Sequence, residues 1–209
     1  MTDFSRQTLQ EFLEALASEA PTPGGGTAAA VAGAMGAALA AMVATLTLSR
    51  EKYAQAHEAV RPIGEAAATG RAELMALARR DAEAYDAVVA ARRLPKESQE
   101  QKSKRARAVA AATRQAAEIP METARLAVRL LESLPELVEK GTPNAASDAG
   151  AAALLLEAAT EAALLNVSIN LAGAEDPAFV SRMQKETADL QVQAQRIRSR
   201  VLAAVRKRF

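Results

Sequence analysis

A stretch without any charged side chain, residues 27–49, most strongly limits how this chain can fold. It follows a Pro-Thr-Pro-Gly-Gly-Gly sequence at residues 21–26, which stops any helix that precedes it. Small residues recur every four positions of the stretch, so they share one face of a helix that another helix can approach closely. The sequence therefore predicts a buried helix in a closely packed helical protein. The small residues are Ala29, Gly33, Ala37 and Ala41, and beside them Gly36, Ala40 and Ala44.

The same stretch is long enough to cross a bilayer, so membrane insertion is the alternative. Alanine, glycine and threonine gain little free energy on entering lipid, and no belt of tryptophan and tyrosine flanks the stretch. The N-terminal residues 1–4 lack the basic segment and apolar core of a signal peptide. We therefore expect a soluble, cytoplasmic protein that does not bind a membrane.

The composition argues against several classes of function. A net charge of +1 and an aromatic content of 3% are atypical of a protein that binds nucleic acid. The chain has no cysteine and a single histidine, His57, which excludes thiol nucleophiles, cysteine ligands and a multi-histidine zinc site. We expect neither a metal nor a bound prosthetic group.

Helical patterns account for the whole chain, residues 1–209, as one domain. The abundant alanine favours helices, and no run alternates apolar and polar residues as a half-buried strand would. Thr27 is predicted to cap the second helix, and Pro120 to interrupt a longer helical segment. The pattern thus predicts an all-α, single-domain bundle of six to seven helices with long core helices. The predicted helices cover about residues 5–19, 27–50, 55–93, 97–118, 121–140, 148–172 and 177–209.

Asp81 is the most informative candidate for chemistry. By helical spacing it shares a face with Leu77, Ala78, Tyr85 and Val88, so its carboxyl group lies within an apolar stripe. Burial there would raise the carboxyl pKa and suit the group to general acid or base catalysis near neutral pH. The alternative is a structural aspartate that pairs with an arginine of another helix.

Three glycines, Gly24, Gly25 and Gly26, form the second candidate. Glycines before a helix let the backbone approach a ligand, and the free amide groups can bind an acceptor or an anion. Their spacing matches neither a dinucleotide-binding fingerprint nor a P-loop, which also needs a lysine and a preceding strand. The alternative is a tight connection between two packed helices.

Polar residues later in the chain form further candidates. Asn144, Ser147 and Asp148 stand at the start of a predicted helix, where they either bind a ligand or cap that helix. Asn166 and Asn170 lie one turn apart on an otherwise apolar face, and either form a directional hydrogen-bond site or bond to neighbouring helices. The basic run from Lys102 to Arg107 is expected to be a solvated helix face, with contact to an acidic substrate tail as the alternative.

These segments, taken in order, resemble the cyclodeaminase/cyclohydrolase family. That family includes the cyclodeaminase domain of formimidoyltransferase-cyclodeaminase and stand-alone bacterial methenyltetrahydrofolate cyclohydrolases. Two positions depart from the family pattern: Thr27 replaces a usual serine, and Gly-Thr-Pro at residues 141–143 replaces a turn that contains Gly-Asn. The resembling blocks are residues 21–30 with 33–39, residues 81–85 with 93–96, residues 144–148 and residues 166–171.

The resemblance implies an all-helical homodimer that binds a tetrahydrofolate substrate in a cleft near the subunit interface. It implies that Asp81 is the catalytic acid or base. We expect substrate contacts from the glycine turn and from the later polar blocks. The expected contact residues are Gly24, Gly25, Gly26, Thr27, Asn144, Ser147, Asp148, Asn166 and Asn170.

The resemblance leaves two reactions open. The favoured expectation is formimidoyltetrahydrofolate cyclodeaminase, which converts 5-formimino-tetrahydrofolate to 5,10-methenyl-tetrahydrofolate and ammonia. The alternative is methenyltetrahydrofolate cyclohydrolase, which converts 5,10-methenyl-tetrahydrofolate to 10-formyl-tetrahydrofolate. An alternative of another class is a helical interaction module without an active site, in which Asp81, Asn166 and Asn170 would be satisfied by other protein groups.

Overall fold

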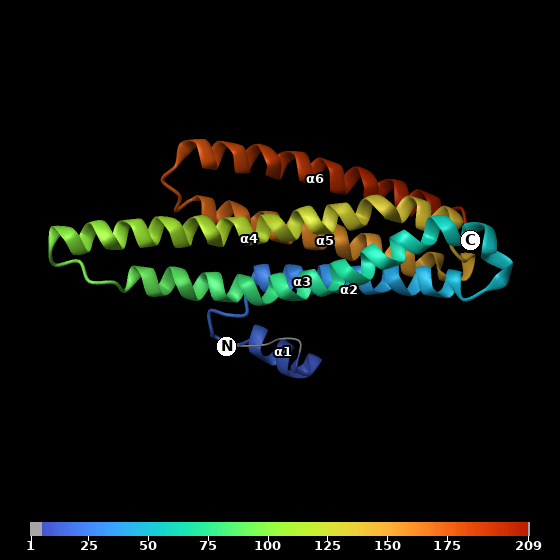
Figure 1. Ribbon diagram of the computed structural model, residues 1–209, viewed down its shortest axis with the longest axis horizontal. Helices are drawn as coiled ribbons and strands as arrows, with labels where there is room; N and C mark the ends of the chain where they lie inside the picture. The colour runs from blue at the N-terminus through green and yellow to red at the C-terminus, as the bar shows by residue number, and fades with distance from the viewer. Residues whose placement is uncertain (1–5, 209) are drawn as a thin grey trace.

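The structure, a computed structural model, describes residues 6–208, and in this part of the chain the fold is all-α (Figure 1). Six α-helices and two short 3-10 helices follow one another, so the expected all-α class with long helices is confirmed. The elements are α1 (Leu9–Leu16), α2 (Gly25–Leu48), η2 (Glu51–Ala56), α3 (His57–Arg92), α4 (Gln99–Lys140), η3 (Pro143–Ala145), α5 (Ala146–Leu171) and α6 (Pro177–Arg206).

Helices α2, α3, α4 and α5 form the central bundle, and each runs antiparallel to the one before it (Figure 1). Neighbours in the chain pack together, and α5 also packs along α2, which closes the four helices into a ring. Helix α6 covers α4 and α5 on the outside, whereas the short α1 lies outside the ring near the beginning of α2. The beginning of α2 therefore meets the end of α5.

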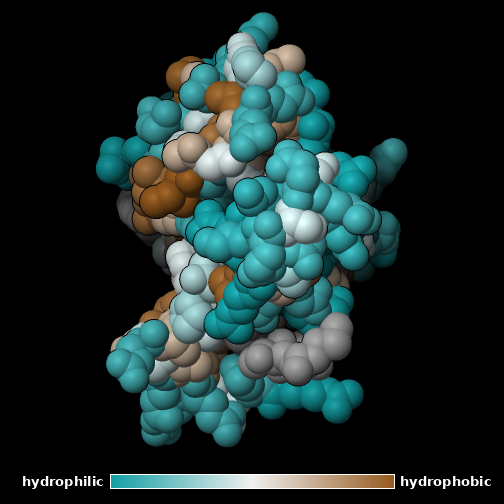
Figure 2. Space-filling model, turned by 90° about the vertical axis from the view of Figure 1, so that its left-hand side faces the viewer, coloured by the Kyte–Doolittle hydropathy of each residue, from teal (hydrophilic) through white to brown (hydrophobic). Residues whose placement is uncertain are grey.

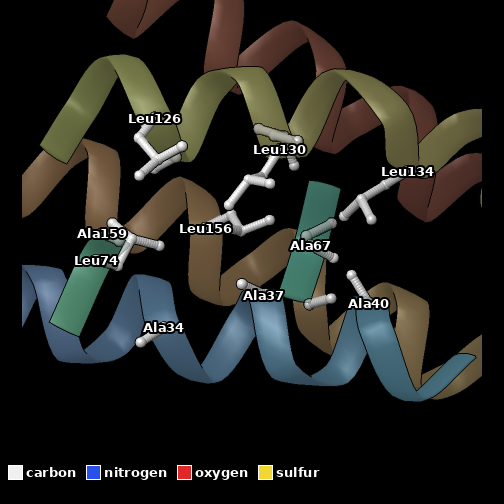
Figure 3. Close-up of a cluster of buried hydrophobic side chains, with 14 of the residues drawn as sticks. Ala34, Ala37, Ala40, Ala67, Leu74, Leu126, Leu130, Leu134, Leu156 and Ala159 are labelled. Carbon is white, nitrogen blue, oxygen red and sulfur yellow. The ribbon is translucent and has the colours of Figure 1, made fainter. Parts of the chain in front are cut away.

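The small residues of α2 allow the predicted close packing. A Cβ atom on Gly36 would lie 3.1 Å from the carbonyl oxygen of Ala152 and 3.2 Å from the backbone nitrogen of Leu156, so the backbones of α2 and α5 nearly touch. Leucine side chains from α3, α4 and α5 fill the space beside the alanines of α2 (Figure 3). The prediction of a buried, small-residue helix is confirmed.

Helix α4 continues through Pro120, where the sequence predicted an interruption, so that boundary was wrong. Proline has no N–H group, which leaves the carbonyl group four residues earlier, on Ala116, without its helical donor. The side-chain nitrogen of Asn170 on α5 donates a 2.7 Å hydrogen bond to this carbonyl oxygen. A neighbouring helix thus supplies the donor that proline lacks.

The last part of α3 and the first part of α4 project beyond the bundle as a two-helix arm, residues 84–113 (Figure 1). The two helices of the arm pack through small side chains, among them the buried Ala84, Ala91 and Ala112. Seen from this end, the surface of the molecule is largely hydrophilic, with hydrophobic groups gathered toward one side (Figure 2). The arm is therefore a slender, solvated extension of the helices that carry Asp81 and Pro120.

Two helical segments are long and apolar enough to cross a membrane: α2, and residues 143–171, which include α5. About half of the most apolar window of each is buried inside the bundle. Core helices of soluble proteins satisfy the same criterion, so length and apolarity alone do not distinguish the two cases.

Candidate active site

Asp81 of α3 meets the first turn of α2. Its Oδ2 accepts a 2.9 Å hydrogen bond from the hydroxyl group of Thr27. Helix α2 begins with Gly24 as its N-cap, and this residue has no side chain to satisfy the free N–H groups of the first turn. The carboxyl group of Asp81 takes a place that an N-cap side chain occupies in other helices. Thr27 lies inside the first turn, so the predicted Thr27 cap was wrong.

Gly26 makes room for this carboxyl group. A Cβ atom at position 26 would lie 2.2 Å from Oδ1 of Asp81, well inside contact distance. Any side chain at this position would displace the carboxyl group. Here glycine is needed for the close approach of Asp81.

Burial raises the pKa of the Asp81 carboxyl group above its ordinary value of 3.8. Hydrogen bonds from Thr27 act in the opposite direction, because they stabilise the anion. The positive end of the α2 dipole also favours the anion. In the described part of the chain no lysine or arginine forms an ion pair with Asp81, so the structure does not have the arginine pair that the sequence left as an alternative.

Asn166 of α5 lies against the start of α2. A Cβ atom on Gly25 would lie 3.2 Å from the side-chain nitrogen of Asn166, which donates to the carbonyl oxygen of Ala162 at 2.9 Å. Within the described residues, the side-chain oxygen of Asn166 accepts no hydrogen bond. The start of α2 therefore brings together a carboxyl group, a hydroxyl group and a free amide oxygen from three helices.

Asn170 lies one helical turn after Asn166, and its side-chain nitrogen donates a hydrogen bond to the carbonyl oxygen of Ala116. The sequence left open whether Asn170 forms a directional hydrogen-bond site or bonds to a neighbouring helix. In the structure it bonds to a neighbouring helix, α4. The substrate contact of Asn170 stays a prediction, for which its side-chain oxygen is the available group.

Asn144, Ser147 and Asp148 lie at the opposite end of the bundle. Ser147 and Asn166 are separated by about 28 Å along α5, from the helical rise per residue. Helix α5 has Ala145 as its N-cap and no side-chain cap, so the predicted cap from Ser147 or Asn144 was wrong. Within one copy of the chain, these three residues cannot line the same site as Asp81.

A groove of about 370 Å³ lies on another side of α3, and Asp81 is not among its lining residues. Three of its charged side chains form ion pairs: Arg80 bonds to Glu122 at 2.6 Å, and Arg125 bonds to Glu186 at 2.6 Å. The residues that the structure describes contain no group of three histidine, cysteine, aspartate or glutamate side chains that could hold a metal ion.

The sequence placed Tyr85 in the same apolar stripe as Asp81, but 43% of its side chain is exposed. Helix α2 begins at Gly25, level with Asp81, and so does not cover α3 farther along the arm (Figure 1). Tyr85 is thus exposed because α2 begins level with Asp81. The spacing of residues along α3 cannot predict where α2 begins.

Comparisons with known proteins add independent information. A sequence model described as formiminotransferase-cyclodeaminase matches residues 8–189. A methenyltetrahydrofolate cyclohydrolase of Methylorubrum extorquens is 38% identical over 97% of both chains. The formimidoyltransferase-cyclodeaminase of Sus scrofa is 34% identical over 87% of this chain, which spans only about a third of that protein. A crystal structure of a formiminotetrahydrofolate cyclodeaminase from Thermotoga maritima superposes with a TM-score of 0.87, at 33% identity, over 97% of this chain and 98% of that one.

Proposed function

Because the chain belongs to the formiminotransferase-cyclodeaminase family, we propose that it hydrolyses 5,10-methenyl-tetrahydrofolate to 10-formyl-tetrahydrofolate, the methenyltetrahydrofolate cyclohydrolase reaction. The observation that carries this proposal is the half-buried Asp81 carboxyl group, which accepts a hydrogen bond from Thr27 at a glycine-lined helix start. The similarity to a cyclohydrolase over 97% of both chains favours this reaction.

Cyclodeaminase, which the sequence alone favoured, is the second candidate. It is supported by the fold and 33% identity shared with the Thermotoga protein. Both reactions act on the same carbon atom, which bridges N5 and N10 in the methenyl compound. Both need a group that moves protons to and from nitrogen or oxygen, so one carboxyl group can serve either reaction.

In the hydrolysis, the Asp81 carboxylate accepts a proton as water adds to the methenyl carbon. The protonated carboxyl group then delivers its proton to N5 as the bond between that carbon and N5 breaks. The hydroxyl group of the adduct releases its proton to solvent, and the carbon remains on N10 as the formyl group. The positively charged substrate and water thus become neutral 10-formyl-tetrahydrofolate and one released proton. A carboxyl group with a raised pKa is suited to both steps, because burial makes its anion easier to protonate than that of an exposed aspartate.

In the cyclodeaminase reaction, N10 of the substrate attacks the formimino carbon and gives its proton to the Asp81 carboxylate. Asp81 passes this proton to the formimino nitrogen, which takes up one further proton from solvent. The bond between the carbon and this nitrogen then breaks, so that ammonia leaves and the positively charged 5,10-methenyl compound remains. Because the nucleophile belongs to the substrate itself, holding the two nitrogens in position supplies much of the acceleration. For either reaction we assign substrate contacts to Gly24, Gly25 and Gly26 through their backbone, and to the free side-chain oxygen of Asn166.

We also propose that the protein is a soluble, cytoplasmic homodimer. The adjacent helices α2 and α5 present an outward face without charge, and a face of this kind marks a protein interface. The charged Glu157 and Glu161 of α5 point instead toward polar groups of α6. The large exposed hydrophobic residues of this α2–α5 face are Met35, Met42, Leu154, Leu165 and Ile169.

A second copy on the α2–α5 face also accounts for the distant candidate residues. A two-fold axis that lies in the interface at right angles to the helices places one end of α5 over the other end of the partner's α5. Asn144, Ser147 and Asp148 of one copy then reach the Asp81 end of the other copy. The dimer would thus unite candidate residues that lie about 28 Å apart in one chain.

One spectrophotometric assay of the methenyl chromophore tests the proposed function. With 5,10-methenyl-tetrahydrofolate, we expect the protein to accelerate the loss of absorbance beyond the rate without protein. With 5-formimino-tetrahydrofolate, a rise in absorbance would identify cyclodeaminase instead. If the purified protein changes neither rate, the enzymatic function is wrong and the interaction module is the better description.

A further inference from the structure

One face of α3 continues past Asp81 along the arm without cover from α2. Tyr85, Val88 and Arg92 follow Asp81 by four, seven and eleven positions, so the four residues form a stripe on one side of the helix. Tyr85 and Arg92 are exposed, and Val88 is half-buried. The stripe therefore runs from a carboxyl group, over an aromatic ring and an aliphatic side chain, to a guanidinium group.

Tyr85 is an unusual residue to find exposed here. The chain has two tyrosines and no tryptophan, and aromatic residues make up only 3% of it. In the described part of the chain its hydroxyl group makes no hydrogen bond, and its ring lies one helical turn from the candidate catalytic carboxyl group. An exposed ring in this position offers a flat surface on which an aromatic ligand can stack.

The arm that carries Arg92 is strongly basic. Residues 84–113 contain seven lysines and arginines against three acidic residues, in a chain whose overall net charge is only +1. Within the described residues none of the seven forms an ion pair. Arg105 alone makes a side-chain hydrogen bond, from its Nε to the backbone oxygen of Arg92. The guanidinium group of Arg92 is therefore unpaired and lies in a region of positive charge, which suits it to bind a carboxylate.

We propose that this stripe binds the aminobenzoyl-glutamate part of the folate substrate, with Tyr85 stacked on the aminobenzoyl ring and Arg92 paired with a tail carboxylate. The inference rests on the proposed function, which puts the reacting carbon beside Asp81. From the helical rise, Tyr85 lies about 6 Å and Arg92 about 17 Å along α3 from Asp81. The order of groups along the stripe matches the order of the reacting bridge, the aromatic ring and the carboxylates in the substrate.

Two charge-reversal variants, one on each side of the arm, test the role of Arg92. We expect Arg92→Glu to raise KM about 10-fold or more at physiological salt with little change in kcat, because it removes a contact made equally in the ground state and the transition state. Arg107→Glu is the matched control. Arg105 faces α3, and Arg107, two positions later, points to the other side of α4.

A second pair of variants tests Tyr85. Tyr85→Ala is expected to raise KM about 3- to 10-fold, whereas Tyr85→Phe keeps the ring and is expected to stay close to the parent. The dissociation constant of 4-aminobenzoyl-glutamate, measured by calorimetry, is a readout that needs no turnover. It should rise by similar factors in Tyr85→Ala and Arg92→Glu. Both side chains are exposed, so circular dichroism should match that of the parent.

The outcomes separate this inference from the proposed function. If the parent turns over folate and Arg92→Glu leaves KM unchanged, or if Arg107→Glu raises KM as much, the assigned subsite is wrong while the function stands. If the parent is inactive on both folates, the proposed function fails. Binding of the aminobenzoyl-glutamate fragment then decides the inference: weaker binding in both variants supports it, and unchanged binding contradicts it.

Discussion

Asp81 combines burial and a hydroxyl donor with the absence of a paired cation, and this combination predicts opposite effects on activity and stability. We expect Asp81→Asn to lower turnover by about 10²- to 10⁴-fold, because the amide cannot exchange the proton. The folded-state pKa of Asp81 is raised, so its contribution to stability is fully present below pH 3.8 and is lost as the pH rises through the folded value. Asp81→Asn should therefore raise Tm at neutral pH.

Folate turnover and thermal unfolding between pH 4 and pH 8 check both effects. The gain in Tm should shrink toward acid pH, where the parent carboxyl group is itself neutral. An Asp81→Asn protein that retains parental turnover would remove Asp81 from the mechanism. A lower Tm at neutral pH would contradict the described environment of this carboxyl group.

Thr27 is expected to influence the pH dependence of activity through its hydrogen bond to Asp81. Its hydrogen bond stabilises the carboxylate, so Thr27→Val should raise the pKa of Asp81 further. The acid limb of kcat/KM against pH should then move to higher pH. Thr27→Ser keeps the hydroxyl group and is the matched control. Identical limbs for the valine and serine variants would mean that this hydrogen bond does not tune the catalytic group.

At the residue scale, Asp81 could be predicted from the sequence because a carboxyl group in an apolar stripe is conspicuous by helical spacing alone. The particular role of Gly26 could not be predicted. Glycine is required at position 26 because the carboxyl group of Asp81, on another helix, packs there. A Cβ atom at this position would lie 2.2 Å from Oδ1 of Asp81. The sequence marks the glycines as a turn, and only the packing identifies the group for which Gly26 makes room.

At the scale of elements, Asn170 and Pro120 form a coupled pair. Asn170→Ala should lower the free energy of unfolding by about 1–3 kcal/mol, because the buried carbonyl group of Ala116 loses its donor. In a Pro120→Ala background the loss should be smaller, since residue 120 then has an N–H group for that carbonyl. Denaturant unfolding of the four proteins in this double-mutant cycle measures the coupling. Equal losses in both backgrounds would contradict the compensation.

Two glycine-to-alanine variants test the contact between α2 and α5. Gly36→Ala should be destabilised by about 1–3 kcal/mol, because its Cβ atom would lie 2.9 Å from Leu156 and 3.1 Å from the backbone oxygen of Ala152. Gly150→Ala, inside α5, adds a Cβ atom with no contact closer than 3.5 Å, so it should be neutral or gain up to about 1 kcal/mol from helix propensity. Similar shifts in the denaturation midpoint for both variants would argue against the close approach.

Helix types and most helix boundaries could be predicted because alanine content and apolar spacing are local signals. The continuity of α4 across Pro120 could not, because the donor comes from Asn170, fifty residues away in sequence. The start of α2 was similarly misplaced: its N-terminal turn lacks a side-chain cap of its own, and Asp81 from α3 lies there instead.

At the scale of the whole molecule, mixed dimers test whether one copy completes the site of another. We expect Asp81→Asn and the double variant Asn144→Ala/Asp148→Ala each to be nearly inactive. If the residues come from different copies, refolding an equal mixture restores one intact site in each mixed dimer, which amounts to about a quarter of parental activity. If they act within one copy, the mixture stays inactive.

The α2–α5 face provides the control for this experiment. Leu165→Glu should yield monomers in analytical ultracentrifugation and abolish the restored activity, because it places a charge in the apolar interface. Val192→Glu alters an equally exposed side chain on α6 and should leave the dimer intact. Monomeric parent protein, or full activity of the Asn144→Ala/Asp148→Ala variant alone, would contradict the shared site.

The ring of four helices also has a consequence for the order of folding. Helices α3, α4, α5 and α6 each pack on the α-helix before them in the chain, and such local pairings form quickly. The pairing of α2 with α5 instead closes a loop formed by residues 49–145, which is entropically the most demanding step. Gly25 and Asn166 meet at that junction, beside Asp81. Recovery of enzymatic activity should therefore lag behind recovery of helical circular dichroism during refolding, because the chain becomes a catalyst only when its first long helix docks.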